Sequence, residues 1–217
     1  MKNVTIFDHP LIRHKVTHLC DVHTGSKEFG ELVTEITMLM GYEALKDLKT
    51  KDVTIQAPLK TFDSPVLDED FTIVPILRAG LGMIEGLRAL SPTAKVGHIG
   101  LYRDEETLEP KTYYFKVPVD VTDGQVIIVD PALATGGSAE AAISYIKGLG
   151  CTRIKFMCII SSEVGLRMLH EKHPDVRIYT AKYVPGELNE KGYIPTAFGD
   201  AGDRISGTCS YNPDHRK

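Results

Sequence analysis

The stretch that decides the fold is "VIIVDPALATGGSAEAAI", residues 126–143. Apolar β-forming residues lead into Asp130, small and hydroxyl residues follow, and an alanine-rich segment comes after them. This pattern predicts a buried strand over 125–130, a tight loop, and a helix that opens at about Gly137. An acid at the end of a buried strand, followed directly by such a loop, marks a place where a ligand can bind.

Similar β-rich runs recur along the rest of the chain. They lie at 53–57, 71–76, 95–102, 154–160 and 176–183, and helical segments at 80–90, 137–148 and 163–172 separate several of them. Near-continuous apolar strands that alternate with helices predict an α/β protein with a parallel sheet covered on both faces. Ligands of such sheets sit outside the carboxyl ends of the strands, which is where Asp130 and its loop belong.

Two local features complete the predicted secondary structure. A helical stripe of apolar residues runs through 27–48, and Ser26 in front of it is a suitable N-cap. Asp68, Glu69 and Asp70 form an acidic cluster before a strand. We expect that cluster to be a solvated turn.

Composition limits the kind of protein this is. The chain has 217 residues, 42% of them hydrophobic and 25% charged, which predicts one folded domain over 1–217. The formal charge of −4 gives no overall attraction to nucleic acid or to a membrane surface, so small soluble ligands are favoured. The scattered cysteines are expected to be reduced thiols of a cytoplasmic protein; they are Cys20, Cys151, Cys158 and Cys209.

The loop after Asp130 has the chemistry of a phosphate site. Unpaired amides at a helix N-terminus attract anions, and the glycines let the backbone come close. Thr135 and Ser138 add hydroxyl donors, while Asp130 can accept from sugar hydroxyls. No lysine follows Gly136 or Gly137 as an ATPase-type phosphate loop requires, and Glu85 replaces the third glycine that a dinucleotide fingerprint would need after Gly80. The pattern indicates a phosphorylated sugar.

The same segment also resembles a known motif. "VIIVDPALATGGS" is similar to the phosphoribosyl-diphosphate (PRPP) motif of type I phosphoribosyltransferases, in the form that uracil phosphoribosyltransferases carry, with Pro131 in place of a second acid. Four further blocks resemble the same family: "HPLIRHKVTHL", "VPILRAGLGM", "GLYRDEETLEP" and "GYIPTAFGDAGDRISGT". Together they cover His9 to Thr208. The resemblance implies a parallel sheet flanked by helices, with a small hood formed by the N- and C-terminal segments.

The resemblance also implies a reaction. Uracil N1 would attack C1′ of PRPP and give uridine monophosphate (UMP) and diphosphate, a glycosyltransferase step of pyrimidine salvage. Because the ribose acquires oxocarbenium character, catalysis should rest on charge neutralisation and alignment, and no covalent nucleophile is needed. Magnesium is the expected cofactor, held mainly through PRPP. The resemblance further implies a homodimer or higher homo-oligomer and GTP as a candidate effector.

Residue roles are carried over from the matching motifs. The expected PRPP-binding residues are Arg78, Arg103, Asp130, Pro131, Ala132, Leu133, Ala134, Thr135, Gly136, Gly137, Ser138 and Asp200. The expected uracil-binding residues are Ile194, Gly199, Asp200 and Ala201. The expected catalytic residues are Arg103, Asp130 and Asp200. Residues 102–115 are either a solvated hairpin or, as the resemblance implies, a lid over PRPP.

Three departures from the family pattern bear on the base site. Pro195-Thr196-Ala197 replaces an apolar residue followed by Pro-Gly, "SSEVG" at 161–165 replaces Ala-Pro-Glu-Gly, and Ser206 stands where phenylalanine is common. Two alternatives to the uracil enzyme therefore stay open. One is an enzyme for another base, and the other is a regulator of the same fold that binds RNA.

A metal site built from histidines is a weaker candidate. His14 and His18 lie four residues apart and His23 follows, a spacing that can ligate a metal on a helix. No nearby carboxylate completes a known arrangement. We expect surface or packed histidines.

Overall fold

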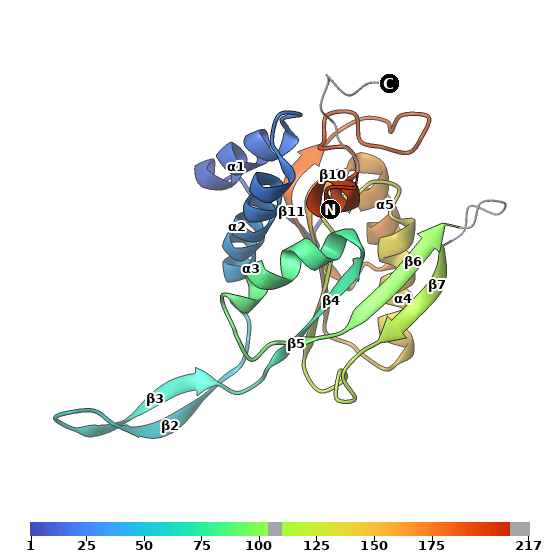
Figure 1. The fold of residues 1–217 in the computed structure, drawn as a ribbon. Coiled ribbons are helices and arrows are strands. Elements are labelled where there is room, and N and C mark those ends of the chain that lie inside the picture. The colour runs from blue at the N-terminus through green and yellow to red at the C-terminus, as the bar shows by residue number, and fades with distance from the viewer. Residues whose placement is uncertain (104–109, 209–217) are drawn as a thin grey trace.

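The computed structural model describes residues 1–103 and 110–208, and it has a central sheet flanked by helices (Figure 1). The strand order is β1-β11-β10-β8-β4-β6-β7. The bounds in that order are Val4–Ile6, Arg177–Val184, Ile154–Ser162, Gln125–Val129, Phe71–Leu77, His98–Arg103 and Pro110–Lys116. Two short strands join this sheet, β5 (Lys95–Val96) beside β4 and β9 (Ala132–Leu133) beside β10. All pairs are parallel except β6 with β7, so the predicted parallel sheet is confirmed.

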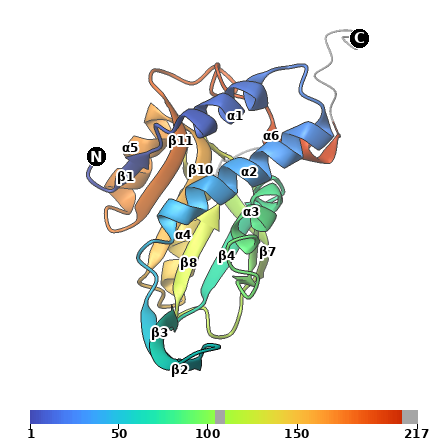
Figure 2. The same ribbon diagram turned by 90° about the vertical axis from the view of Figure 1, so that its left-hand side faces the viewer.

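Helices cover both faces of the sheet. One face carries α1 (Pro10–Cys20), α2 (Ser26–Ala44), a 3-10 turn η1 (Ala79–Met83), α3 (Ile84–Arg88) and α6 (Ala201–Ser206), and the other carries α4 (Gly137–Gly148) and α5 (Glu163–Lys172) (Figures 1 and 2). Side chains of β8 alternate between the layers: Ile127 packs in the α2 layer, Ile128 in the α4 layer. Burial on both faces explains why the strands read as continuous apolar runs.

Several predicted elements differ from the observed ones. Ser26 is the first residue of α2, and Gly25 is its N-cap, without a side-chain bond. The run 53–57 is a strand, but β2 (Thr50–Gln56) pairs only with β3 (Thr61–Leu67) in a hairpin that projects from the body (Figure 1). Almost all of its residues are exposed, so no apolar layer draws it into the central sheet.

The predicted helix 80–90 and the predicted strand 95–102 are each divided. The former is the turn η1 followed by the short helix α3. Close packing accounts for its start, because a Cβ on Gly80 would lie 2.5 Å from the Val129 carbonyl oxygen. The latter is interrupted at Gly97, where β5 ends and β6 begins one residue later.

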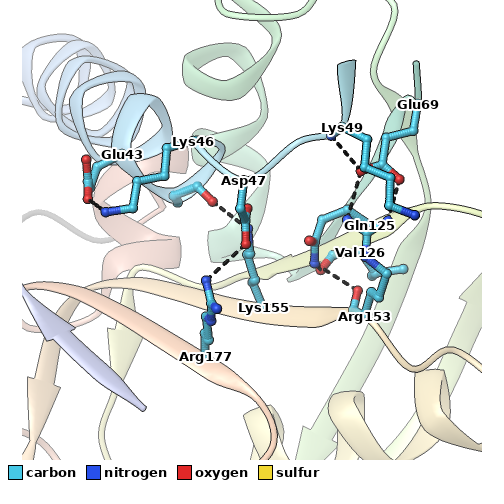
Figure 3. Close-up of polar contacts among 11 residues, drawn as sticks. Glu43, Lys46, Asp47, Lys49, Glu69, Gln125, Val126, Arg153, Lys155 and Arg177 are labelled. Atoms are coloured by element: carbon cyan, nitrogen blue, oxygen red, sulfur yellow. Dashed lines mark hydrogen bonds and ion pairs between the residues drawn. The ribbon is translucent and has the colours of Figure 1, made fainter. Parts of the chain in front are cut away.

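A polar cluster stabilises the edge of the sheet where the parallel strands begin (Figure 3). The side chain of Lys155, 3% exposed, donates to the Ala44 carbonyl at 2.7 Å and pairs with Asp47, which also binds Arg177 at 3.0 Å. A buried ammonium is tolerated here because its donors are used. The cluster therefore joins the end of α2 to β10 and β11.

Glu69 belongs to the same edge of the sheet, and the expectation of a solvated acidic turn is wrong for it. Its side chain is 11% exposed, pairs with Nη1 and Nη2 of Arg153, and accepts from the Lys49 amide at 3.1 Å. These hydrogen bonds, led by the one from Arg153, lower the pKa of Glu69 to about 2. The pair holds the root of the β2–β3 hairpin against the sheet.

The hood consists of α1, the start of α2, and the C-terminal segment with α6 (Figure 2). The guanidinium of Arg204 in α6 is the main link between them. It donates to the carbonyls of Leu19, Asp21 and Thr24 at 2.9, 2.7 and 2.9 Å, and it lies 4.4 Å from the centre of the Phe29 ring. The expected hood of N- and C-terminal segments is confirmed. Within the described part of the chain, no helix has the length and apolar character to cross a membrane.

Candidate active site

The loop 130–138 lies at the edge of the sheet where the parallel strands end. Strand β8 stops at Val129, and α4 opens at Gly137 as the sequence predicts. Its N-cap, Gly136, has a φ of 89° and no side chain, and a Cβ there would lie 2.4 Å from the Met168 methyl. Only glycine suits this position, and it leaves the first amides of the helix uncovered by a capping side chain.

The loop is held in place by the strand and helix that follow. Ser162 caps α5 by accepting from the Gly165 amide at 2.9 Å, and its hydroxyl also donates to the Ala134 carbonyl at 2.5 Å. A Cβ on Gly165 would lie 2.6 Å from the same carbonyl oxygen. The pattern "SSEVG" thus supplies a hydroxyl and a close approach that together fix the loop.

One cavity of about 300 Å³ brings the loop and the C-terminal segment together. Of the residues expected to bind PRPP or uracil, those that line it are Asp130, Ala132, Leu133, Ala134, Thr135, Gly136, Ser138, Ile194, Gly199, Asp200 and Ala201. Pro131 and Gly137 belong to the same loop, but they are not among the described residues that line the cavity. Pro131 is buried, and its carbonyl accepts from Ile159 and Ile160 at 3.0 Å, so it serves the sheet.

Two carboxyl groups face this cavity from opposite walls. Burial raises the pKa of Asp130 to about 7, and the charge of Asp200 adds to the rise, whereas the Ala132 amide at 3.5 Å opposes it. Asp200 is the N-cap of α6 and accepts from the Asp203 amide at 2.9 Å. A cation or a hydrogen-bonding ligand between the walls would favour the charged form of Asp130.

The residues fit a magnesium ion that is held mainly by a ligand. The cavity offers carboxylate oxygens, which Mg²⁺ prefers, from Asp130 and Asp200. The described part of the chain holds no group of three or more histidine, cysteine or acidic side chains placed to bind a metal. Two carboxylates would leave most of the six positions around Mg²⁺ to water or to an anionic substrate.

Arg78, expected to bind PRPP, is not among the described residues that line the cavity. A cis peptide bond joins it to Leu77 at the end of β4, and the next residue, Ala79, lines the cavity. The Arg78 side chain is 56% exposed, and its guanidinium pairs with the Asp203 carboxylate at 3.0 Å. Arg103 is the last residue of β6, but its side chain and residues 104–109 lie outside the described part. The two ends of the segment 102–115 lie in the antiparallel strands β6 and β7, and the alternative of a hairpin or a lid falls on 104–109, outside the described residues.

Comparisons with known proteins show the family of this chain. A family model described as uracil phosphoribosyltransferase matches residues 6–208. The chain belongs to this family. It is 52% identical to the uracil phosphoribosyltransferase of Brevibacillus brevis over 209 residues, which are 96% of this chain and all of the relative. The enzyme of the same name from Dictyoglomus thermophilum is 55% identical, over 94% of this chain and 99% of the relative.

Solved structures give the same picture of the fold. The AQ2163 protein from Aquifex aeolicus matches with a TM-score of 0.88 and 36% identity, over 93% of this chain and 97% of the other. An adenine phosphoribosyltransferase from Trypanosoma brucei, 15% identical with a TM-score of 0.59 over all of this chain and 91% of the other, shares the fold. The type I phosphoribosyltransferase fold and the resemblance to the uracil family are thereby confirmed. The relatives' names favour the enzyme over an RNA-binding regulator.

Some residues that line the cavity are absent from the expected set. The cavity is also lined by Ala79, Ala139, Lys191, Gly192, Tyr193, Ala197 and Gly202. Most of them fall inside blocks that carry the resemblance, so block membership could have indicated them. Lys191 lies one residue before the block that begins at Gly192. Only the tertiary structure shows that Lys191 borders the cavity.

The histidines of the hood have other partners. The rings of His14 and His18 pack edge to face with centres 4.6 Å apart, and His23 contacts the Asp21 carboxylate at 2.9 Å. These contacts fit the expectation of surface and packed histidines. The thiols of Cys20, Cys151 and Cys158 are free, whereas Cys209 lies outside the described residues.

Proposed function

We propose that this member of the uracil phosphoribosyltransferase family converts uracil and PRPP to UMP and diphosphate in the cavity between the loop 130–138 and the C-terminal segment. One observation carries the proposal. A helix N-terminus suited to phosphate and the acid Asp130 face Ile194 and Gly199 across a single cavity of about 300 Å³. A phosphorylated sugar and a flat base can therefore meet there.

PRPP is held by the loop and by nearby arginines in this proposal. The amides at the start of α4 and the hydroxyls of Thr135 and Ser138 bind the 5′-phosphate. Asp130 accepts hydrogen bonds from the ribose hydroxyls, which favour its charged form and lower its pKa from about 7. Arg78 leaves its salt bridge with Asp203 and binds the diphosphate instead. Arg103 is the second arginine proposed to bind the diphosphate. The paired N–H donors of a guanidinium match the diphosphate oxygens.

Uracil is recognised by backbone groups of the C-terminal segment. Gly199, with a φ of 75°, exposes its peptide groups where a side chain would block a flat ring, and Ile194 and Ala201 complete the contact. Uracil offers an N3–H donor and a 4-oxo acceptor. Cytosine reverses both roles, so the same backbone groups would be left unpaired against it.

The chemistry requires alignment and charge, with no covalent nucleophile. As the bond from C1′ to diphosphate lengthens, positive charge develops on the ribose, and the carboxylates of Asp130 and Asp200 stabilise it. Uracil N1 attacks C1′ and gives up its proton to solvent, and diphosphate leaves with the electron pair of the C1′–O bond. Asp130 and Asp200 would hold magnesium together with PRPP, and the ion would supply positive charge next to the diphosphate leaving group. The walls of the cavity hold base and sugar in line.

Finer expectations also belong to this proposal. The resemblance supports a single catalytic domain over 1–217, a cytoplasmic location, assembly into a homodimer or larger homo-oligomer, and GTP as an effector. Light scattering of the purified chain measures its assembly. Initial rates with and without GTP at subsaturating uracil measure the effector.

The test is a base panel with matched variants. The chain is mixed with PRPP, magnesium and, separately, uracil, cytosine, hypoxanthine or orotate, and nucleotide and diphosphate are quantified. We expect UMP from uracil, and a fall in kcat/KM of about a hundredfold or more in Asp130→Asn, since a charge next to the reacting carbon is lost. Asp52→Asn, in the exposed hairpin strand β2, is the control. Product from hypoxanthine but not from uracil would overturn the proposal.

A further inference from the structure

The loop between β11 and α6 forms the wall of the cavity that faces Asp130. Residues 191–194, 197 and 199–200 of this loop line the cavity. Two apolar side chains anchor it: Ile194 is 5% exposed and Phe198 is 3% exposed. The Phe198 ring meets that of Phe29 edge to face, with centres 5.7 Å apart. The backbone on either side of these anchors is what a base in the cavity would contact.

Between the two anchors lies the turn Pro195-Thr196-Ala197, where the chain departs from the pattern of its family. Proline has no amide to donate, and the side chain of Thr196 is exposed. The Ala197 amide bonds to the Ile194 carbonyl at 3.2 Å. The Thr196 carbonyl accepts from the side-chain amine of Lys182 at 3.1 Å, which ties the turn to a strand fourteen residues earlier.

Lys182 is itself fixed on the sheet. It lies in β11 opposite Ile160 of β10. Its carbonyl accepts from the Thr180 hydroxyl at 3.1 Å and from the Ser161 hydroxyl at 3.4 Å. Its charge also reaches Cys20, where burial raises the thiol pKa and Lys182 partly lowers it again. The ammonium group therefore occupies a defined place between α1 and the turn.

We propose that Lys182 is a positioning residue for the nucleobase. By holding the Thr196 carbonyl, Lys182 fixes the backbone from Ile194 to Gly199 in the position where the peptide groups of that backbone meet the edge of the pyrimidine. The inference rests on the proposed function, since it assumes that uracil lies against this wall. Lys182 is not among the residues that line the cavity in the described part of the chain, so it acts through the turn.

This role differs from that of a residue that only stabilises the fold. The bond to Thr196 is exposed to solvent, and the anchors Ile194 and Phe198 hold the loop on the core without it. Loss of the amine should therefore leave the loop folded but its turn free to shift. The substrate that meets the turn is affected most, whereas PRPP is held mainly by the loop 130–138, and Asp200 keeps its own bond to the Asp203 amide.

The experiment compares three variants of the full chain. Lys182→Met keeps most of the side-chain volume and removes the ammonium, Lys182→Arg keeps a donor that can reach a carbonyl, and Lys172→Met at the end of α5 is a control at the opposite edge of the sheet. Initial rates are measured with uracil varied at saturating PRPP, and then with PRPP varied at saturating uracil. Thermal unfolding of each variant is recorded as well.

We expect Lys182→Met to raise KM for uracil about tenfold, as loss of one hydrogen bond to a charged donor can do. KM for PRPP and kcat should stay within about threefold of wild type, and Lys182→Arg should recover most of the loss. The Lys172→Met values should match those of wild type. If Lys182→Met does not fold, Lys182→Gln is measured against Lys182→Arg by the same criteria.

Two results would overturn the inference. One is an unchanged KM for uracil in Lys182→Met, and the other is an equal rise of KM for both substrates with no recovery in Lys182→Arg. Failure of the proposed function is a separate result, because wild-type protein would then form no UMP. If wild-type protein forms UMP and Lys182→Met has the same KM for uracil, only the positioning role is refuted.

Discussion

Replacing Arg204 by methionine should loosen the hood from the C-terminal segment. The Arg204 side chain is buried, and the residue as a whole is 5% exposed. Its guanidinium donates to Leu19, Asp21 and Thr24 within 2.9 Å and more weakly to Phe198 at 3.4 Å. Methionine fills a similar volume but donates nothing. The carbonyls that lose their donor must then find water or remain unpaired.

The size of the effect follows from these contacts. A hydrogen bond from a charged donor contributes about 1.5–3 kcal/mol, and the carbonyls that lie near the surface regain part of this from water. The contact of the guanidinium with the Phe29 ring, at 4.4 Å, adds roughly 1 kcal/mol. We therefore expect the free energy of unfolding to fall by about 3–5 kcal/mol. For a chain of this size that lowers Tm by roughly 6–20 °C.

The assay is urea unfolding followed by far-ultraviolet circular dichroism, with activity measured on the same samples. Arg204→Lys should fall between wild type and Arg204→Met, because an ammonium keeps the charge but cannot span the separated carbonyls. Arg13→Met is the control: its salt bridge with Asp8 joins side chains that are 71% and 86% exposed, so the change should be below about 0.5 kcal/mol. An Arg204→Met free energy of unfolding within about 1 kcal/mol of wild type would refute the reasoning.

Two further predictions concern acid stability and the phosphate loop. The pKa of Glu69 is about 2 in the folded state against 4.5 ordinarily, so its pair with Arg153 stabilises the fold above pH 4.5 and loses that contribution as pH falls toward 2. After screening by solvent this amounts to roughly 1–2 kcal/mol. Urea unfolding of wild type and Glu69→Gln should therefore converge between pH 5 and about 2, and a constant gap would contradict it. Gly136→Ala should lower the free energy of unfolding by about 1–3 kcal/mol and weaken PRPP binding at least about tenfold in calorimetry. The reason is that φ at Gly136 is 89° and that Met168 lies where a Cβ would be. Gly148→Ala is the control and should be neutral, because a Cβ on Gly148 meets open space.

Local patterns were enough for much of the fold. The helices at 137–148 and 163–172 have the predicted bounds, and the strand after Gly124 ends within one residue of the prediction. The signals that predict these elements lie within a few residues of each other in the sequence. They are apolar periodicity, a glycine in front of one helix and a serine that caps another. The run 53–57 is a strand as predicted, but its pairing with β3 outside the central sheet was not predictable, because a strand's partner depends on which surface is left to bury it, and its own residues do not encode that.

The sequence by itself determined that the chain is α/β, that Asp130 comes directly after a buried strand, and that a loop of small and hydroxyl residues leads into the next helix, since each depends on neighbours in the chain. Only the tertiary structure decided that Asp200 lies across a cavity from Asp130 and raises its pKa, and that Glu69 is paired with Arg153. It also decided that Lys182 holds Thr196. Burial and electrostatic interaction depend on distance in space, and chain folding sets that distance between residues far apart in sequence.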